Sequence, residues 1–365
     1  MSSIGEQFEL YSGNTPSRMN KNQFDGSINW ITSGELKEHY ISDTKEKISE
    51  EAAKNNSLKL LPVGTFVIAI YGLEANGVRG TCSITTREST ISQACMAFTS
   101  KMDIQNEFLY SWYKKHGNII GIKYAQGTKQ QNLSYDIIER FNISYPCMEE
   151  QKKLIRFISL IDQRIATQNK IIEDLKKLKS AISERLFNAI KGDVVVLEDI
   201  GDVVKGKQIN GEFLSESGKY YVMNGGIEPS GFYNDYNVEA NTISISEGGN
   251  SCGYVQFNAC PFWSGGHCYT IQNTTDNVKT EYLYQFLKSK ESEIMKLRIG
   301  SGLPNIQKKD LAKFKITIPN ISEQKVISAF LSSFERKADV EMNFVNLLLE
   351  EKQYLLRQMF ICCLL

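Results

Sequence analysis

Lysine, arginine and side-chain amide residues recur in the polar loops of this 365-residue chain. Arginine and lysine donate hydrogen bonds to guanine edges and to phosphates, whereas asparagine and glutamine pair with adenine edges. The ordinary alternative is that these loops are polar only because they are solvated. We predict contacts with double-stranded DNA from eight of these residues: Arg18, Lys21, Lys129, Gln130, Lys205, Lys207, Arg298 and Lys308.

Two other groups of residues are weaker candidates for chemistry. Cys260, His267 and Cys268 stand close together, but no plausible fourth zinc ligand follows at metal spacing, so free and mostly buried thiols are favoured. The segment "GDVVKGKQ" at 201–208 matches G-x-x-x-x-G-K, but Gln208 stands where a phosphate-binding loop has the Ser or Thr that holds magnesium. We therefore expect no metal and no cofactor bound by this chain.

Catalytic groups are also scarce. The chain has three histidines, and none of them recurs in the internal repeat described below. A DNA methyltransferase needs a glycine-rich cofactor loop and an Asn- or Asp-Pro-Pro-aromatic segment, and the sequence contains neither. The pattern favours a binding protein over an enzyme.

Composition limits the class of protein further. The 42 basic residues are balanced by 42 acidic ones, whereas a protein that grips nucleic acid alone normally has a basic surplus. Partner proteins are therefore expected to contribute part of the contacts with DNA. No apolar stretch approaches the roughly 18 residues that span a membrane, so we expect a cytoplasmic protein without membrane contact.

The elements that must position these loops occur twice. The run "PCMEEQKKLIRFISLIDQRI" begins at Pro146, and "PNISEQKVISAFLSSFERKA" begins at Pro319, which is 173 residues later. Residues 127–187 align with 300–360 without a gap. Convergent composition would not hold one register over such a length, so the chain is an internal duplication. At this offset, residues 193–199 have no counterpart before Ser3.

Each copy has a strand-rich part followed by a long helix. Short β-type runs such as "TFVIAI" (65–70) and "NTISIS" (241–246) alternate with loops rich in Gly, Asn, Ser and Thr. The prediction is an α+β protein with two tandem strand-rich α/β domains, at 1–147 and 193–319. Two spacer helices, at 148–192 and 320–365, follow them.

The helical segments carry a heptad pattern. Apolar residues follow a four-three spacing from Leu154 to Leu186 and again from Ile327 to Met359. A helix of about 33 residues is about 50 Å long and cannot bury such a seam alone, so we predict that the two helices pair as an antiparallel coiled coil.

Polar residues interrupt this seam at matched steps. Four residues are expected to set the register, with Lys179 facing Glu341 and Gln168 facing Lys352. The alternative is that all four are solvated positions at the edge of a looser seam.

Motifs in both copies resemble those of a known family. They are "GNTPSR" (13–18), "GTKQQNLSYDIIERFNISYPCMEEQKKL" (127–154) and "GSGLPNIQKKDLAKFKITIPNISEQKVI" (300–327). Over essentially its whole length the chain resembles the specificity subunit of type I restriction-modification systems.

The resemblance implies a non-catalytic DNA-recognition subunit. Each strand-rich domain would be a target recognition domain that reads one half of a bipartite DNA site, and the coil would act as the spacer. Two modification subunits, which carry S-adenosylmethionine and methylate adenine N6, would dock on the helices, and restriction subunits would join them.

The docking surface is expected at the paired helix starts, at Glu150, Gln151, Glu323 and Gln324. The same residues also suit the first turn of any helix, where a carboxylate faces the positive end of the dipole.

Two alternatives to this function stay open at this point. A two-headed scaffold could bridge two identical partners without reading sequence, and, more remotely, the chain could methylate DNA unaided. Sequence-selective DNA binding by the assembled complex separates the first alternative from the specificity subunit.

Overall fold

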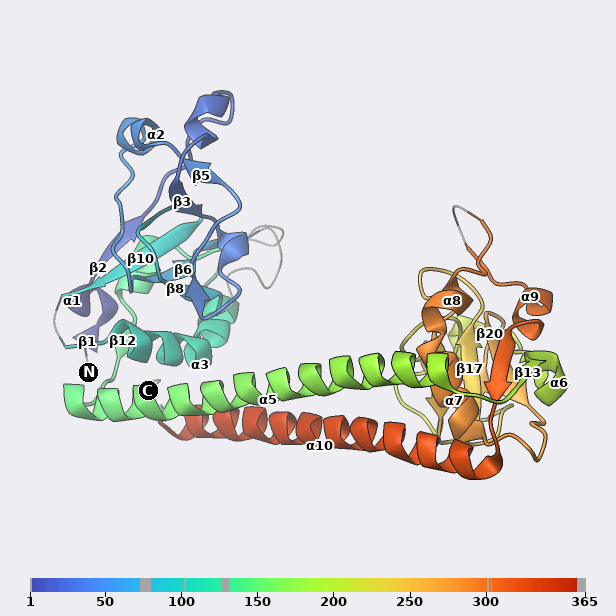
Figure 1. Cartoon of the computed structure of the whole chain (residues 1–365). Coiled ribbons are helices and arrows are strands. Elements are labelled where there is room, and N and C mark those ends of the chain that lie inside the picture. Colours follow the sequence, from blue (N-terminus) through green and yellow to red (C-terminus); the bar gives the residue numbers. More distant parts are fainter. Residues whose placement is uncertain are drawn as a thin grey trace. The chain divides into compact units, whose positions relative to one another are not determined.

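The computed structural model describes residues 2–72, 80–101, 103–125, 131–300, 302 and 304–359 (Figure 1). The chain divides into two compact units, Met1–Thr167 with Val345–Leu365 and Gln168–Phe344. Each unit contains one strand-rich globule together with parts of both long helices, α5 (Met148–Ala189) and α10 (Ile321–Met359). The predicted α+β class with two tandem domains is confirmed.

The main sheet of the first unit has the strand order β2-β10-β6-β8-β4. Strand β10 runs antiparallel to both of its neighbours, β2 and β6, and α3 covers one face of the sheet. The sheet and its helix comprise β2 (Phe8–Ser12), β4 (Tyr40–Ile41), β6 (Phe66–Ala69), β8 (Cys82–Thr85), β10 (Cys95–Ser100) and α3 (Asn106–Tyr124).

Burial on both faces explains the apolar run of β6. Phe66 and Ile68 pack with Phe108 and Trp112 of α3, whereas the alternate residues of the strand face a second cluster that includes Leu61. Since successive side chains of a strand point to opposite faces, a strand buried on both sides must be apolar throughout.

The remaining elements of the first unit are short. A second sheet has the order β5-β3-β9 and packs around Trp30, and two further strand pairs are β1 with β12 and β7 with β11. These elements are β1 (Ser2–Ser3), α1 (Ile4–Gln7), β3 (Ile28–Ile31), β5 (Lys47–Ile48), α2 (Glu50–Asn55), β7 (Tyr71–Gly72), β9 (Ser89–Ile91), β11 (Gln131–Asn132), α4 (Tyr135–Glu139) and β12 (Asn142–Ile143).

The second unit repeats this plan with the strand order β14-β20-β17-β18 and with α7 on the core face. Its main elements are β14 (Asp202–Lys205), β17 (Thr242–Ser246), β18 (Val255–Asn258), β20 (Cys268–Gln272) and α7 (Thr280–Ser289). Around them lie β13 (Asp193–Val196), α6 (Leu197–Ile200), β15 (Tyr220–Met223), β16 (Phe232–Tyr233), β19 (Trp263–Ser264), α8 (Glu291–Met295), α9 (Lys308–Ala312) and β21 (Lys315–Ile318).

Strand register shows the duplication directly. β10 pairs with β2 and β6, and β20 pairs in the same way with β14 and β17. The register makes three pairs of positions equivalent: Met96 and Tyr269, Ser12 and Lys205, and Ile68 and Ile245. Gly80 and Gly253, which the repeat also matches, both have left-handed φ angles of 75° and 91°, the conformation that favours glycine in a turn.

The start of the first copy corrects one sequence interpretation. Ser2 of β1 lies opposite Ile143, and Val195 of β13 lies opposite Ile316, which is the equivalent of Ile143. Ser2 is therefore the counterpart of Val195, and residues from 195 onward do have counterparts. The fixed offset of 173 concealed them because the first copy carries extra residues between its first strands and β10.

The two long helices pair in antiparallel fashion within each unit. In the first unit, Lys352 Nζ lies 2.5 Å from Asp162 Oδ1, and Leu154 and Leu356 pack on the same core cluster. In the second unit, Gln168 bonds to Glu341 and Lys179 bonds to Glu335. Residue numbers therefore increase along α5 as they decrease along α10. Antiparallel pairing is confirmed.

The predicted register of the polar residues is wrong. Lys179 pairs with Glu335, not with Glu341, and Lys352 pairs with Asp162, not with Gln168. The predicted register pairs polar residues of the seam with one another. Asp162 and Glu335 stand beside the seam, at positions that the duplication makes equivalent, and each carboxylate reaches a lysine of the other helix.

Candidate nucleic-acid interface

Several loops of the second unit meet at one edge of its main sheet. Because β20 runs antiparallel to both neighbours, its first residue lies beside the last residues of β14 and β17. Backbone hydrogen bonds hold the loops together there: Gly206 N donates to Cys268 O, Glu247 N to His267 O, and Ile306 N to Glu247 O. Four of the predicted DNA contacts belong to these loops or lie beside them.

A charged group occupies the centre of this edge. Lys205 Nζ donates to Glu247 Oε1 at 2.6 Å, and the Tyr269 hydroxyl lies 3.1 Å from the same oxygen. His267 Nδ1 lies 3.7 Å from the other carboxylate oxygen, Oε2. The Glu247 side chain is 9% exposed, whereas those of Lys205 and His267 are 51% and 64% exposed. We name Lys205, Glu247 and His267 the edge triad.

Strand alternation explains why a carboxylate is buried here. Ile243 and Ile245 of β17 face the core, and Glu247 occupies the next inward position just beyond the end of the strand. A buried carboxylate is costly unless it is paired, and Lys205 and Tyr269 supply that pairing. Burial and the neighbouring Glu247 carboxylate both raise the pKa of Tyr269, so its hydroxyl keeps its proton.

The other three predicted contacts of the second unit are also exposed. Lys207 follows β14, and its backbone is fixed from both sides, since Lys207 N donates to Ser264 O and Trp263 Nε1 donates to Lys207 O. Arg298 lies in the loop after α8, and Lys308 opens α9.

The structure places fewer of the predicted contacts in the first unit. Arg18 forms a bidentate ion pair with Glu46, in which the two guanidinium nitrogens lie 2.8 and 2.9 Å from the two carboxylate oxygens. The guanidinium group also lies over the rings of Phe24 and Trp30. The hydrogen bond from Arg18 lowers the pKa of Glu46. Lys21 begins a 3-10 turn at Lys21–Phe24, but its side chain is not among those described, and Lys129 and Gln130 lie outside the described residues.

The equivalent edge of the first unit has different chemistry. Leu133 N donates to Ile70 O as Ile306 N donates to Glu247 O, so Ile70 occupies the place of Glu247. Ser12 stands in place of Lys205, and Met96 in place of Tyr269. These residues line a hollow of about 450 Å³ together with Gln93 and Tyr135. One framework thus presents different side chains in its two copies.

The two glutamines of the repeated Glu-Gln-Lys motif are internal clamps. Gln151 Oε1 accepts from Gln105 N at the start of α3, and its amide nitrogen donates to Asp103 O and Pro146 O. Gln324 makes the equivalent three bonds, to Lys279 N, Asn277 O and Pro319 O. Both residues are 0% exposed. This burial contradicts a docking role for their side chains.

Glu150 and Glu323 beside them are exposed and stay predictions for docking. Apolar side chains are exposed nearby at duplicated positions, with Phe157 45% and Phe330 46% exposed. A groove of about 600 Å³ also lies against Glu323, lined by Leu186, Ile190, Val326 and Ile327 among others.

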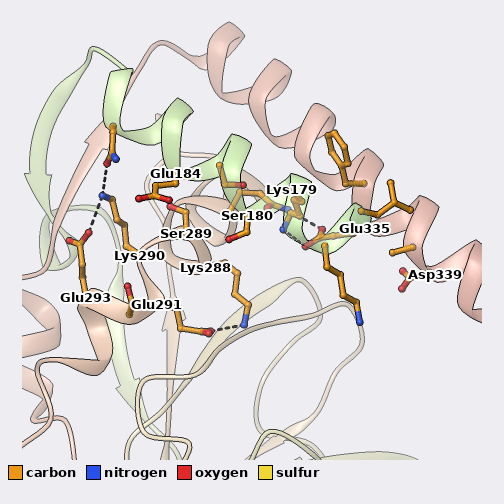
Figure 2. Close-up of a pocket in the computed structure, with 18 residues that line it drawn as sticks. Lys179, Ser180, Glu184, Lys288, Ser289, Lys290, Glu291, Glu293, Glu335 and Asp339 are labelled. Carbon is orange, nitrogen blue, oxygen red and sulfur yellow. Dashed lines mark hydrogen bonds and ion pairs between the residues drawn. The ribbon is translucent and has the colours of Figure 1, made fainter. Parts of the chain in front are cut away.

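Another hollow of the second unit, of about 640 Å³, lies where α7 and α8 meet the paired helices (Figure 2). Glu335 accepts hydrogen bonds there from Lys179, Tyr284 and Gln285. Lys290, which also lines the hollow, bonds to both Asn188 and Glu293. These bonds connect α7 and the residue that follows it to both helices of the coil.

Within the described residues, no group of three or more His, Cys, Asp or Glu side chains is arranged to hold a metal ion. Cys268, one of the weak zinc candidates, is buried, and burial raises its thiol pKa to about 11. Zinc binds the thiolate form, which this burial disfavours. The described helices also include none that is both long and apolar enough to cross a membrane.

Comparison with known proteins decides the family. The family model for the type I restriction modification DNA specificity domain matches residues 1–177 and again residues 191–348. The chain belongs to this family. Members are similar over most of its length: the specificity subunit of the type I restriction enzyme MjaIX from Methanocaldococcus jannaschii is 26% identical, and the alignment covers 85% of this chain and 81% of that subunit.

Further relatives agree with this assignment. The EcoR124I/EcoR124II specificity subunit of Escherichia coli is 26% identical over 48% of this chain and 43% of its own length. The crystal structure of a type I restriction-modification S subunit from M. genitalium matches with a TM-score of 0.62 at 18% identity, over 98% of this chain and 95% of that one. A structure from a study of type I complex assembly matches with a TM-score of 0.65 at 16% identity, over 98% and 96%.

Sequence reasoning found Lys205 but missed its two partners in the edge triad. Glu247 follows "NTISIS", and its place in the inward-facing alternation could have marked it as a buried carboxylate. In the sequence, His267 stands out only through its neighbours Cys260 and Cys268. Its place beside Glu247 depends on strand pairing between β17 and β20, which no local pattern encodes.

Proposed function

We propose that the chain is the DNA sequence-specificity subunit of a type I restriction-modification complex. Each unit contributes one target recognition domain, and the two domains read the two halves of a bipartite site. One observation carries this proposal: two copies of the same family domain present different side chains at the same sheet edge. Duplication without divergence would suit a symmetric scaffold, whereas this divergence suits two different half-sites.

DNA contact by the predicted loop residues follows from their exposure and charge. Lys205, Lys207, Arg298 and Lys308 stand at or beside one edge of the second domain, where their positive charges attract the phosphate backbone. In the first domain Arg18, Lys21, Lys129 and Gln130 stay predictions. Base contacts and phosphate contacts can be told apart by experiment. Loss of a base contact relaxes discrimination at one position of the DNA site, whereas loss of a phosphate contact weakens binding to all sequences.

The partners are two modification subunits, which dock on the helix starts around Glu150 and Glu323. Two equivalent surfaces on one chain suit two copies of one partner. S-adenosylmethionine would be held by those subunits, and the chain itself would take no part in catalysis. Restriction subunits complete the assembly, and the cytoplasm is the compartment in which it meets DNA.

Binding of the reconstituted complex to a random DNA library tests the proposed function. The chain and its modification subunit are mixed with the library at several salt concentrations, and bound DNA is sequenced. We expect enrichment of a bipartite motif with an unspecified centre, and an affinity that falls as salt rises. Binding without sequence enrichment would instead support the scaffold alternative.

A further inference from the structure

The Lys205 side chain is anchored by an ion pair at the sheet edge of the second domain. Its ammonium group donates one hydrogen bond to Glu247 Oε1 at 2.6 Å, although half of its side chain is exposed. A free lysine has a flexible four-carbon stem and reads no particular geometry. An anchored lysine loses much of that freedom before it meets DNA, which lowers the entropic cost of a specific contact.

Glu247 is itself held in place by several groups. Tyr269 reaches Oε1, the backbone of Glu247 bonds to His267 O and Ile306 N, and Cys252 Sγ donates to the Glu247 carbonyl. Its second carboxylate oxygen, Oε2, is buried and accepts no hydrogen bond in the described part of the chain. The carboxylate oxygens lie close to the side chains of Lys205, Tyr269 and His267, and the thiols of Cys252 and Cys268 also interact electrostatically with Glu247.

From this geometry we propose that Lys205 reads a guanine in the half-site of the second domain, and that Glu247 is the residue that positions Lys205 for this contact. An ammonium group has three donors, and one is spent on Glu247. The remaining two suit the paired acceptors O6 and N7 on the major-groove edge of guanine. His267, on the far side of the carboxylate, offers a further donor toward the same DNA.

The first domain supports a role in specificity over a role in folding. Ile70, Ser12 and Met96 occupy the equivalent places, and the same backbone hydrogen bond joins Leu133 N to Ile70 O. The framework therefore forms without the edge triad. A charged group that the fold does not require, placed where the two copies differ, is expected to discriminate between half-sites.

The inference rests on the proposed function, and its test uses the complete complex of the chain with its modification subunit. Affinities are measured for DNA duplexes that carry the enriched site and each single base change in it. For Lys205→Ala we expect loss of about tenfold discrimination at one G·C pair of one half-site, with the other half-site unchanged. Lys205→Arg should retain guanine preference, because arginine bonds the same two acceptors.

Glu247→Gln should relax discrimination at the same base pair and leave affinity for non-cognate DNA equal or higher, since a negative charge near the phosphates is removed. Glu198→Gln, an exposed carboxylate on α6 of the same domain, is the matched control and should change neither quantity. A thermal unfolding curve of each variant checks folding, and Lys205→Ala, at an exposed residue, tests the contact independently of any change at Glu247.

Equal weakening on all sequences by Lys205→Ala would show a phosphate contact and overturn the inference. Unchanged affinities on all duplexes would overturn it as well. Failure of the proposed function has a different signature, because the unsubstituted complex would then fail to select any sequence.

Discussion

At the scale of single residues, Gln151 and Gln324 explain why Glu-Gln-Lys recurs in the sequence. Each side chain satisfies one backbone N–H group and two carbonyl groups at the point where the globule meets a long helix. A glutamine amide has both donors and an acceptor, so it can serve all three groups, which a glutamate cannot. The motif thus marks a joint between domain and helix.

Gln151→Ala is predicted to destabilise the first unit. The substitution leaves a buried N–H and two buried carbonyl groups without their partner, and each such loss costs about 1–3 kcal/mol. We expect the unfolding free energy to fall by roughly 3 kcal/mol in urea denaturation. Glu150→Ala, at the exposed neighbour, should change it by less than about 0.5 kcal/mol. Equal effects of the two substitutions would contradict the clamp.

Sequence alone could not separate Glu150 from Gln151. Both stand in a first helical turn, where polar residues are ordinary, and burial of the second depends on the chain before α3 folding back onto the helix. Lys205 was found because a basic loop residue needs no tertiary contact to be noticed. Glu247 was missed because its meaning depends on Lys205 and Tyr269, which lie far away in the sequence.

At the scale of elements, the heptads of α5 and α10 predicted two long helices that pair, and the predicted antiparallel direction is correct. The polar register was not predictable from the seam alone, because the lysines reach carboxylates that stand beside it. The repeat makes the ion pair of Lys179 with Glu335 equivalent to the ion pair of Lys352 with Asp162. Gln168 and Glu341, which bond to each other, are themselves equivalent positions. The strand pairing of Ser2–Ser3 escaped prediction because two residues carry no periodic signal.

Charge reversal at both helix starts is predicted to weaken docking of the modification subunit. Glu150 and Glu323 are exposed at equivalent places, close to apolar groups that a partner could cover. A chain with both Glu150→Lys and Glu323→Lys should retain less partner in a pull-down, by about tenfold, since a rim charge reversal costs roughly 1–2 kcal/mol. Asp174→Lys with Glu350→Lys, exposed elsewhere on the same helices, is the control. Equal recovery from both double variants would place the docking surface elsewhere.

At the scale of the whole molecule, duplication supplies two recognition domains and a paired helix from one ancestral unit. The repeat and the motifs predicted this organisation, because both are visible in the amino-acid sequence itself. Which side chains meet at each sheet edge was not predictable, since the loops between strands differ in length between the copies. Function therefore depends on both the fold and the loop residues. The shared fold positions one sheet edge in each domain, and the residues that differ between the copies decide which DNA sequence that edge recognises.

We propose that the length of the coil sets the separation of the two half-sites, and lengthening both helices tests this proposal most directly. One heptad is inserted after Gln168 and another after Glu341, positions that face each other, so that the contacts on either side are kept. Seven residues add about 10 Å of helix, which is about three base pairs of DNA. Sequencing of methylated DNA from cells that carry the modified complex should show the same two half-sites with a spacer about three base pairs longer. The same half-sites with an unchanged spacer would contradict the account.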